Sequence, residues 1–453
     1  MVIIFTDRKR LGKILKIKRL ELDFTLEALA DKNISASTIS LIERGHENVS
    51  ENKIMYLCKK LDIDIQQDLE KMEKSRHKEE QEFLSKLKPI ENMIDLIDPK
   101  QGLKRLNPLL KNIQPTTSPK VIAIMYYLKG RAYTRKGRLQ NNEKDLDRAE
   151  KNFKESLAIL EQKPELKTSN LQVLIYHELA RVYYFRNDFD NALINVQKGL
   201  SLFNEKGERT YIKHTLKISK AIYLEKLDQL HESLKVLEEM WNDIHIIQNI
   251  NVILNMYETR AIVLKRLNRP REALQYCIEG IEIARLNEIH ERSFELWTVL
   301  GSIYSDLRNF ERAEECFEIV FGLKHQVKKK YLFINPYTEL GKMHLKRGVF
   351  SEAIKYLKEA VAIGEETNDS PRLAQALLAL GDCFFHQNRL EEALPFYNRA
   401  YQIASKHKFK RILRDILLQY VQCAKEVDYS NYHKLVDKLI KIEVELKDKG
   451  DIV

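Results

Sequence analysis

Apolar residues recur at helical spacing from the start of the chain, beginning with Leu11, Ile14 and Leu15. Glycine and proline are scarce, at 15 and 10 of 453 residues, which is too few for the frequent turns of an all-β protein. The pattern therefore predicts an all-α protein. A chain of this length exceeds one ordinary hydrophobic core, so we expect two or more domains or an array of repeats.

Residues 8–63 have the apolar pattern of five short helices, and four of them can be delimited. They are expected at residues 8–22, 26–30, 36–44 and 51–61. Thr25 and Ser35 precede the second and third, where a hydroxyl oxygen can accept a hydrogen bond from a free backbone N–H. Gly45 ends the third, because glycine adopts the left-handed conformation that often follows a helix. Two short helices joined by a tight turn predict a DNA-binding helix-turn-helix within residues 1–65.

This segment resembles the Xre/Cro repressor family in Leu11-Gly12, in Arg19, and in the stretches TLEALA at 25–30 and STISLIERG at 37–45. The resemblance implies that Arg19 pairs with Glu43 to join the first helix to the third. It also implies that the third helix enters the major groove, where short side chains contact bases through hydroxyl and methyl groups. Leu26 departs from the family, in which many members carry a phosphate-binding Gln, and the turn is one residue shorter than usual. We expect DNA contacts from Thr25, Ala36, Ser37, Thr38, Ser40 and Leu41.

The first predicted helix carries seven basic and no acidic residues between positions 8 and 19. Such a run is commonly a solvated face, but beside a helix-turn-helix we expect it to contact phosphates, which makes binding salt-dependent. Twelve basic and ten acidic residues over positions 1–64 leave the domain at only +2. One copy would bind weakly, so we expect a dimer on a palindromic operator in double-stranded DNA. The expected phosphate contacts are Arg8, Lys9, Arg10 and Lys13.

Residues 66–88 are highly charged and predict a helical linker, either a solvated connector or an arm exchanged between protomers. From residue 89 to residue 450 the chain repeats with a period of about 40 residues. Two small residues lie twelve positions apart in each repeat, because antiparallel helices approach closely only where their side chains are small. An earlier unit has about seven extra residues between its helices. The pairs lie at 130/149, 180/192, 221/233, 261/273, 301/313, 341/353 and 381/393.

This pattern resembles the tetratricopeptide repeat (TPR), lengthened from 34 to about 40 residues, with eight or nine helix pairs and capping helices at the C-terminus. Stacked TPR pairs form a right-handed superhelix whose groove is lined by the first helix of each pair. Asn255, Glu295, Asn335 and Gln375 occupy one groove position at intervals of 40. Side-chain amides can bond the backbone of an extended peptide, although solvated groove residues would show the same pattern. The other expected peptide contacts are Tyr127, Arg131, His177, Arg181, Tyr184, Glu258, Thr298, Ser302, Thr338 and Lys342.

Composition excludes several other classes of protein. The formal charge of +10 arises from 76 basic and 66 acidic residues, so it suggests a polyanion partner without requiring one. The five cysteines lie far apart and predict small apolar core residues in a reducing cytoplasm. We expect no signal peptide, because the first residues have only a short apolar run, and no apolar run is long enough to span a membrane. We expect no metal, no cofactor and no enzyme, because phosphate-binding glycine loops, nucleophile elbows and zinc-binding His pairs are missing.

The whole layout resembles the RRNPP family of peptide-responsive quorum-sensing regulators, especially its Npr- and Plc-like members. The resemblance implies a homodimer or tetramer that binds DNA and changes its geometry or oligomeric state when a signalling oligopeptide enters the groove. Two alternatives remain open. A Rap-like protein would instead bind a response regulator with the helices before the repeats and place a catalytic Gln there; Gln66, Gln67, Gln81, Gln101 and Gln114 lie in that region. A scaffold would take a protein tail in the groove.

Overall fold

The computed structural model describes residues 8–63, 65–114, 117–140, 142–162, 169–407 and 409–447. Within these ranges the chain is helical and has no strand, apart from an isolated antiparallel bridge between Asp31 and Ile34. It divides into two compact units, which are described separately. Unit 1 comprises residues 1–93 and 108–121, and unit 2 comprises residues 94–107 and 122–453.

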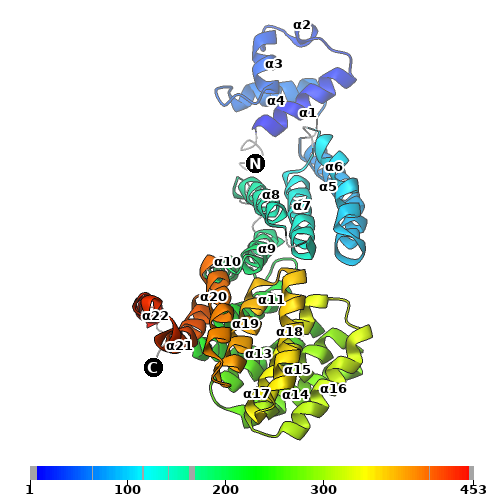
Figure 1. The fold of residues 1–453 in the computed structure, drawn as a ribbon. Coiled ribbons are helices and arrows are strands. Elements are labelled where there is room, and N and C mark those ends of the chain that lie inside the picture. The colour runs from blue at the N-terminus through cyan, green and yellow to red at the C-terminus, as the bar shows by residue number, and fades with distance from the viewer. Residues whose placement is uncertain are drawn as a thin grey trace. The chain divides into compact units, whose positions relative to one another are not determined.

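Unit 1 begins with four short helices, labelled in Figure 1: α1 (Arg8–Glu21), α2 (Leu26–Leu29), α3 (Ala36–Glu43) and α4 (Glu51–Lys60). The described part of residues 8–63 thus contains four helices and not the five that we expected. Both predicted N-caps are confirmed, because Thr25 accepts from the Ala28 amide at 3.0 Å and Ser35 accepts from the Thr38 amide at 3.2 Å. Gly45 has the expected positive φ of 72°. The core consists of Leu11, Ile14, Leu15, Leu29, Ile34, Ile39, Ile42, Val49, Ile54, Leu57, Cys58, Leu61 and Ile63.

The predicted ion pair between Arg19 and Glu43 is confirmed and is almost fully buried. The Arg19 guanidinium donates to both Glu43 carboxylate oxygens, at 2.6 and 3.2 Å, and to the Phe24 carbonyl at 2.6 Å. One arginine therefore holds α1, the end of α3 and the connection to α2 together. Gly12 makes this approach possible, because a Cβ at that position would lie 2.3 Å from the Ile42 carbonyl oxygen.

The charged segment 66–88 lies within one long helix, α5 (Ile65–Asn92), which confirms its helical character. The domain boundaries at residues 65 and 88 stay predictions. A π-helical segment, η2 (Met93–Ile97), follows α5. No helix in the ranges that the structure describes has the length and hydropathy of a membrane span.

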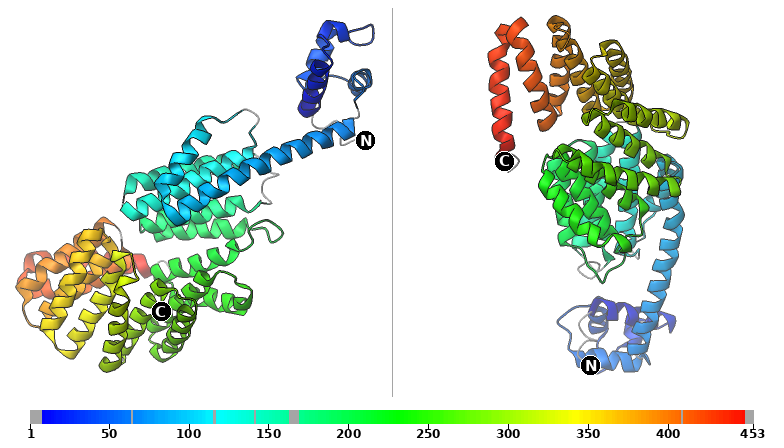
Figure 2. Two further views of the ribbon diagram at one scale, coloured as in Figure 1. Left: turned by 90° about the vertical axis from the view of Figure 1, so that its right-hand side faces the viewer. Right: turned by 90° about the horizontal axis from the view of Figure 1, so that it is seen from below.

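Unit 2 is a stack of antiparallel helix pairs, which Figure 2 shows from two sides. Short 3-10 segments join some of the helices: η4 (Ile244–Ile246), η5 (Leu323–His325) and η6 (Lys330–Phe333). The helices are α6 (Pro99–Lys111), α7 (Pro119–Gln140), α8 (Glu143–Glu161), α9 (Leu171–Phe185), α10 (Phe189–Ser201), α11 (Ile212–Lys226), α12 (Leu230–Asn242), α13 (Ile250–Arg266), α14 (Pro270–Leu286), α15 (His290–Asp306), α16 (Phe310–Gly322), α17 (Ile334–Arg347), α18 (Phe350–Thr367), α19 (Ser370–Phe385), α20 (Leu390–Lys406), α21 (Lys410–Val427) and α22 (Tyr429–Lys447).

Each predicted pair of small residues places one member on each helix of a pair, from α7 and α8 to α19 and α20. Ala180 and Ala192, for example, lie on α9 and α10 and are fully buried. The repeat also fixes the turn in the six pairs from α9–α10 to α19–α20, because a residue with positive φ follows the first helix of each. These residues are Asn187, Asp228, Asn268, Arg308, Gly348 and Asn388, again about 40 apart, and only one of them is glycine.

Where the first small residue of a pair is glycine, a large side chain from the second helix occupies the space beside it. A Cβ at Gly130 would lie 2.6 Å from the Phe153 ring, and one at Gly381 would lie 2.7 Å from the Tyr397 ring. Because Phe153 and Tyr397 are fully buried, neither ring can move away freely. All five cysteines are buried and unpaired, as we expected.

We expect Gly130→Ala to lower the free energy of unfolding by about 2 kcal/mol, because the added methyl group overlaps the Phe153 ring. An alanine in a helix is normally stabilising by roughly 0.5–1 kcal/mol relative to glycine. Gly322→Ala is the matched control, since nothing lies within 4 Å of its Cβ position. Urea unfolding followed by circular dichroism measures both. Equal effects of the two substitutions would contradict the close-crossing explanation, whereas Phe153→Leu should partly rescue Gly130→Ala.

Candidate functional site

From α9 to α21 the first helix of each pair packs against the first helix of the next pair, and α7 reaches α9 through Arg131 and Glu178. We call the side of these first helices on which polar side chains contact the adjoining repeat the groove face. On this face a cation from one repeat bonds groups of the next. The Lys265 ammonium of α13 donates to the Ser302 hydroxyl of α15 at 2.8 Å and lies 3.7 Å from a Glu339 carboxylate oxygen of α17. Lys342 donates to Glu339 at 2.9 Å. The predicted positions Ser302 and Lys342 are therefore on one face, as expected, but both belong to an internal charge network.

A second cluster on the groove face surrounds the buried carboxylate of Glu178. Arg181 donates to it at 2.9 Å, and the Arg131 guanidinium lies 3.9 Å from it while pairing with Asp95 at 2.7 Å. Arg131 also donates to the Tyr127 hydroxyl at 3.1 Å. Burial lowers the pKa of His177 to about 4, so this imidazole is neutral at pH 7. The structure thus brings Tyr127, Arg131, His177 and Arg181 together, but Tyr127 and His177 are buried.

Arg292 of α15 is shared between two carboxylates of the groove face. It donates to Glu258 at 3.1 Å and to Glu295 at 2.8 Å. Burial, followed by repulsion from Glu295, raises the pKa of Glu258 to about 7. A cavity of about 200 Å³ adjoins this group, and its lining is Arg138, Asn251, Ile289, Glu291, Arg292, Glu295, Lys329, Tyr331 and Leu332.

The amides at the repeated position remain open, unlike the charged groups. Asn335 and Gln375 are exposed and Asn255 is half-buried. Among the described residues none forms a hydrogen bond to these three side-chain amides, whereas Glu295 at the same repeat position holds Arg292. We call Asn255, Asn335 and Gln375 the amide column.

Two expectations about hydroxyl groups need correction. Thr298 and Thr338 are buried, and their hydroxyls donate to the carbonyls of Phe294 and Ile334 at 2.8 and 2.7 Å. A threonine inside a helix readily bonds the carbonyl four residues earlier, so these hydroxyls are not presented to a ligand. Tyr184 is on the groove face, but its ring stacks on Tyr223 with centroids 5.4 Å apart.

Several groove residues escaped the sequence analysis. Glu178 and Glu339 each lie three residues before a predicted groove cation, Arg181 and Lys342, which is the spacing of ion pairs on a helix; that repeated pattern could have revealed them. Arg138 and Arg372 could not have been found in this way. Both arginines contact the ring of Tyr331, which lies far from each of them in the sequence.

Unit 1 presents a second candidate surface on α3. Ser37 and Leu41 are exposed, and Ala36, Thr38 and Ser40 are half-buried. Thr25 and the Ser35–Thr38 pair serve as capping groups. Lys13 is exposed on α1, but Arg8 donates to the carbonyls of Glu47 (2.8 Å) and Val49, which makes it a structural tie rather than the free phosphate contact that we expected. The side chains of Lys9 and Arg10 lie outside the described part of the chain.

The pKa shifts of Glu258, which shares Arg292 with Glu295, and of Glu339 are opposite in direction, so neutralising each carboxylate should change stability in opposite ways. The pKa of Glu258 is about 7 in the folded protein and 4.5 in the unfolded chain. Between these two pH values the folded protein therefore keeps a proton on Glu258 that the unfolded chain has lost. This carboxyl therefore destabilises the fold above pH 7, and the penalty disappears as the pH falls towards 4.5. Glu258→Gln should raise the free energy of unfolding by about 2 kcal/mol at pH 8 and by little at pH 5.

Glu339→Gln is the matched control. Because Lys342 and Lys265 outweigh burial and lower the pKa of Glu339 to about 2, its carboxylate stabilises the fold fully above pH 4.5. Its removal should destabilise by a nearly constant amount from pH 5 to pH 8, measured by urea unfolding. An effect of Glu258→Gln that does not change with pH would contradict the raised pKa.

Comparisons with known proteins agree with the repeat architecture. The tetratricopeptide-repeat pattern matches residues 332–406, and a second form of it matches residues 123–159 and 294–324. Tetratricopeptide repeat protein 29 of Trypanosoma brucei brucei is 22% identical over 241 residues, which cover 50% of this chain and 48% of that protein. The chain therefore spans about half the length of this relative.

Solved structures share the fold at low sequence identity. The apo form of the quorum sensor NprR from B. thuringiensis matches with a TM-score of 0.54 at 16% identity, over 80% of this chain and 99% of that one. NprR in complex with its cognate peptide NprX matches with a TM-score of 0.51 at 16% identity, over 79% and 89%. A Rap protein complexed with Competence and Sporulation Factor matches with a TM-score of 0.50 at 13% identity, over 82% and 99%. Unit 2 thus contains tetratricopeptide-like repeats, and its fold is similar to that of these solved structures.

Proposed function

We propose that this chain is a cytoplasmic transcription regulator of the RRNPP type, whose repeat groove binds a short oligopeptide and whose N-terminal helices bind DNA as a homodimer or tetramer. The observation that carries the proposal is the amide column. Its three amides recur in register with the repeat, whereas the charged groups around them are largely paired with one another.

An extended peptide fits this arrangement of partners. Its backbone offers N–H and C=O groups at regular intervals, and each side-chain amide can both donate to it and accept from it. The neighbouring cation–carboxylate pairs would keep the groove face polar without placing an unpaired charge against the ligand. The NprR structure with its cognate peptide NprX shares this fold, which supports the choice of ligand class.

The DNA-binding half rests on α2 and α3. Arg19 fixes α3 against α1, so the exposed Ser37 and Leu41 lie on a helix held in place by an ion pair, and the width of the DNA major groove admits an α-helix. A peptide would act on DNA binding by favouring one geometry of the repeat array over another. The shift in this equilibrium cannot exceed the peptide's difference in affinity for the two geometries.

Peptide binding is tested by affinity selection from a random hexapeptide library on the full chain. Asn255→Ala and Asn335→Ala should each weaken binding of the selected peptides about tenfold, because each loses hydrogen bonds to the peptide backbone. Gln275→Ala is the matched control, since it removes the same kind of amide from α14, the second helix of its pair. Unchanged affinity in both asparagine variants, measured by calorimetry, would exclude the amide column as the binding site.

DNA binding is tested by gel shift on the promoter fragment upstream of the gene. Lys13→Glu should weaken binding and lower the dependence of log K on log salt by about one counterion. Lys358→Glu makes the same charge change on an exposed position of α18 and should leave DNA binding unchanged. If the two variants behave alike, α1 does not contact the phosphates.

The Rap-like alternative can be told apart from the proposed regulator by its effect on a phosphorylated response regulator. A response-regulator phosphatase would accelerate the loss of phosphate from its partner, whereas a regulator without enzymatic activity would leave the rate unchanged. We therefore expect no acceleration with any phosphorylated response regulator of the host.

A further inference from the structure

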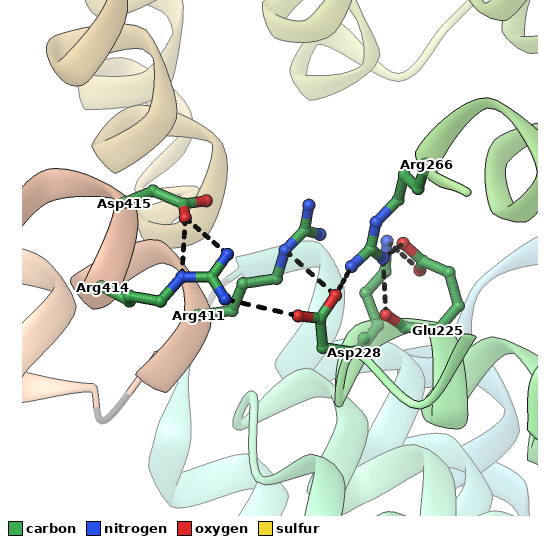
Figure 3. Close-up of polar contacts among 7 residues, drawn as sticks. Glu225, Asp228, Arg266, Arg411, Arg414 and Asp415 are labelled. Atoms are coloured by element: carbon green, nitrogen blue, oxygen red, sulfur yellow. Dashed lines mark hydrogen bonds and ion pairs between the residues drawn. The ribbon is translucent and has the colours of Figure 1, made fainter. Parts of the chain in front are cut away.

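Asp228 joins two distant parts of the repeat array. It lies in the left-handed turn that follows α11, with φ at 70°, and accepts a hydrogen bond from Arg266 of α13. Arg411 and Arg414 of α21 reach the same carboxylate from the far end of the array, at 3.5 and 3.7 Å. Figure 3 shows the three guanidinium groups gathered around Asp228. One carboxylate thus faces three arginines.

The other two arginines have further partners. Arg266 donates to the Glu225 carboxylate at 2.5 Å and to the Glu225 carbonyl at 2.7 Å. Arg414 donates twice to Asp415, at 3.0 and 3.2 Å. Asp415, Asp228 and Glu443 together raise the pKa of Arg414, so its charge is well compensated.

The charge of Arg411 is compensated less completely than that of Arg266 or Arg414. The Nε of Arg411 lies 3.5 Å from Asp228 but forms no hydrogen bond within the described residues, and its two terminal nitrogens point away from Asp228 in Figure 3. Burial lowers the pKa of Arg411, and the charge of Arg266 lowers it further against the opposing effects of Asp228, Asp415 and Glu225. Arg266 and Arg414 each contact a carboxylate besides Asp228, whereas Arg411 contacts only Asp228 among the described residues and shares it with both of them.

The basic residues at the start of α21 also lie where a helix favours negative charge. Lys410, Arg411 and Arg414 lie at the N-terminus of α21, whose first turn contains no acidic residue. A helix N-terminus carries partial positive charge and favours anions, so this arrangement is the reverse of what the helix dipole stabilises. Lys226 adds a further cation beside Glu225. Lys410 is compensated separately by Glu445 at 2.7 Å.

We infer that the open guanidinium of Arg411 is a binding site for an oxyanion, a carboxylate or a phosphate, at the contact between α21 and the α11–α12 turn. A planar guanidinium with two free terminal nitrogens matches the two oxygens of either group. The bound anion would give Arg411 a counter-charge that it does not share, and would reduce its repulsion with Arg266 and Arg414. It would therefore strengthen the link that Asp228 makes between the α11–α12 pair and α21, near the C-terminal end of the array. This site is separate from the amide column and does not depend on the proposed function.

The experiment compares the full-length wild-type chain with Arg411→Gln. Sodium phosphate and sodium acetate are added separately against sodium chloride at equal ionic strength, and thermal unfolding is followed by circular dichroism. We expect phosphate or acetate to raise the wild-type Tm by about 2 °C. Arg411→Gln should lose this increase, and calorimetry should show about tenfold weaker anion binding. Lys410→Gln removes a neighbouring cation from the same helix and should keep the response.

A third probe distinguishes the source of the anion. Random hexapeptides with a free C-terminal carboxylate are compared with the same pool in amidated form. A response of the wild type to phosphate or acetate supports a site for free oxyanions. If the wild type responds only to the peptides with a free carboxylate, and Arg411→Gln loses this response, the site binds the C-terminal carboxylate of a peptide. Equal responses of the wild type and Arg411→Gln to all three probes, or no response to any of them, would overturn the inference; Arg411→Lys, which keeps the charge but not the planar group, serves if the glutamine variant is unstable.

Discussion

The close approach of two antiparallel helices at one small residue on each is the constraint on which unit 2 depends. Where that residue is glycine, a large side chain from the partner helix fills the space, as Phe153 does at Gly130, Leu357 at Gly341 and Tyr397 at Gly381. The crossing sets the angle within a pair, and its repetition every 40 residues sets the angle between pairs. Because interiors are densely packed, a small change at one crossing is transmitted to the next pair rather than absorbed locally.

That regular stacking also determines what the groove face can do. It brings the first helices into contact, so a residue at one repeat position meets residues of the adjoining repeat. Lys265 bridges two repeats in this way, and Arg292 divides itself between Glu258 and Glu295. Charges on this face are therefore arranged mainly to satisfy one another. The groups left open to a ligand are neutral amides, and discrimination would come from hydrogen bonding and shape rather than from charge.

Sequence patterns predicted those features that local or periodic rules control. The caps at Thr25 and Ser35 depend on a few neighbouring residues, and the small-residue pairs depend on a fixed period, so both could be located. The Arg19–Glu43 pair was reached only through family resemblance. The position of a residue in the repeat or in a helix did not predict its contacts where its side chain could bond several partners. Thr298 faces the right way, yet its hydroxyl bonds its own helix, and Arg8 bonds backbone carbonyls rather than remaining free. Contacts such as that of Arg138 with Tyr331 depend on the curvature of the whole array, which no local pattern contains.

The same curvature brings distant repeats together around Asp228. Asp228 occupies the left-handed position that ends the first helix in each pair, where other repeats have Asn268, Arg308, Gly348 or Asn388. The turn conformation does not require a carboxylate there, since asparagine and glycine adopt it more readily. An aspartate at this position is explained by the arginines that surround it. Arg266 and Arg414 each have a second carboxylate, Glu225 and Asp415, whereas Arg411 has only its share of Asp228. An anion bound at Arg411 would therefore strengthen the contact between α21 and the α11–α12 turn.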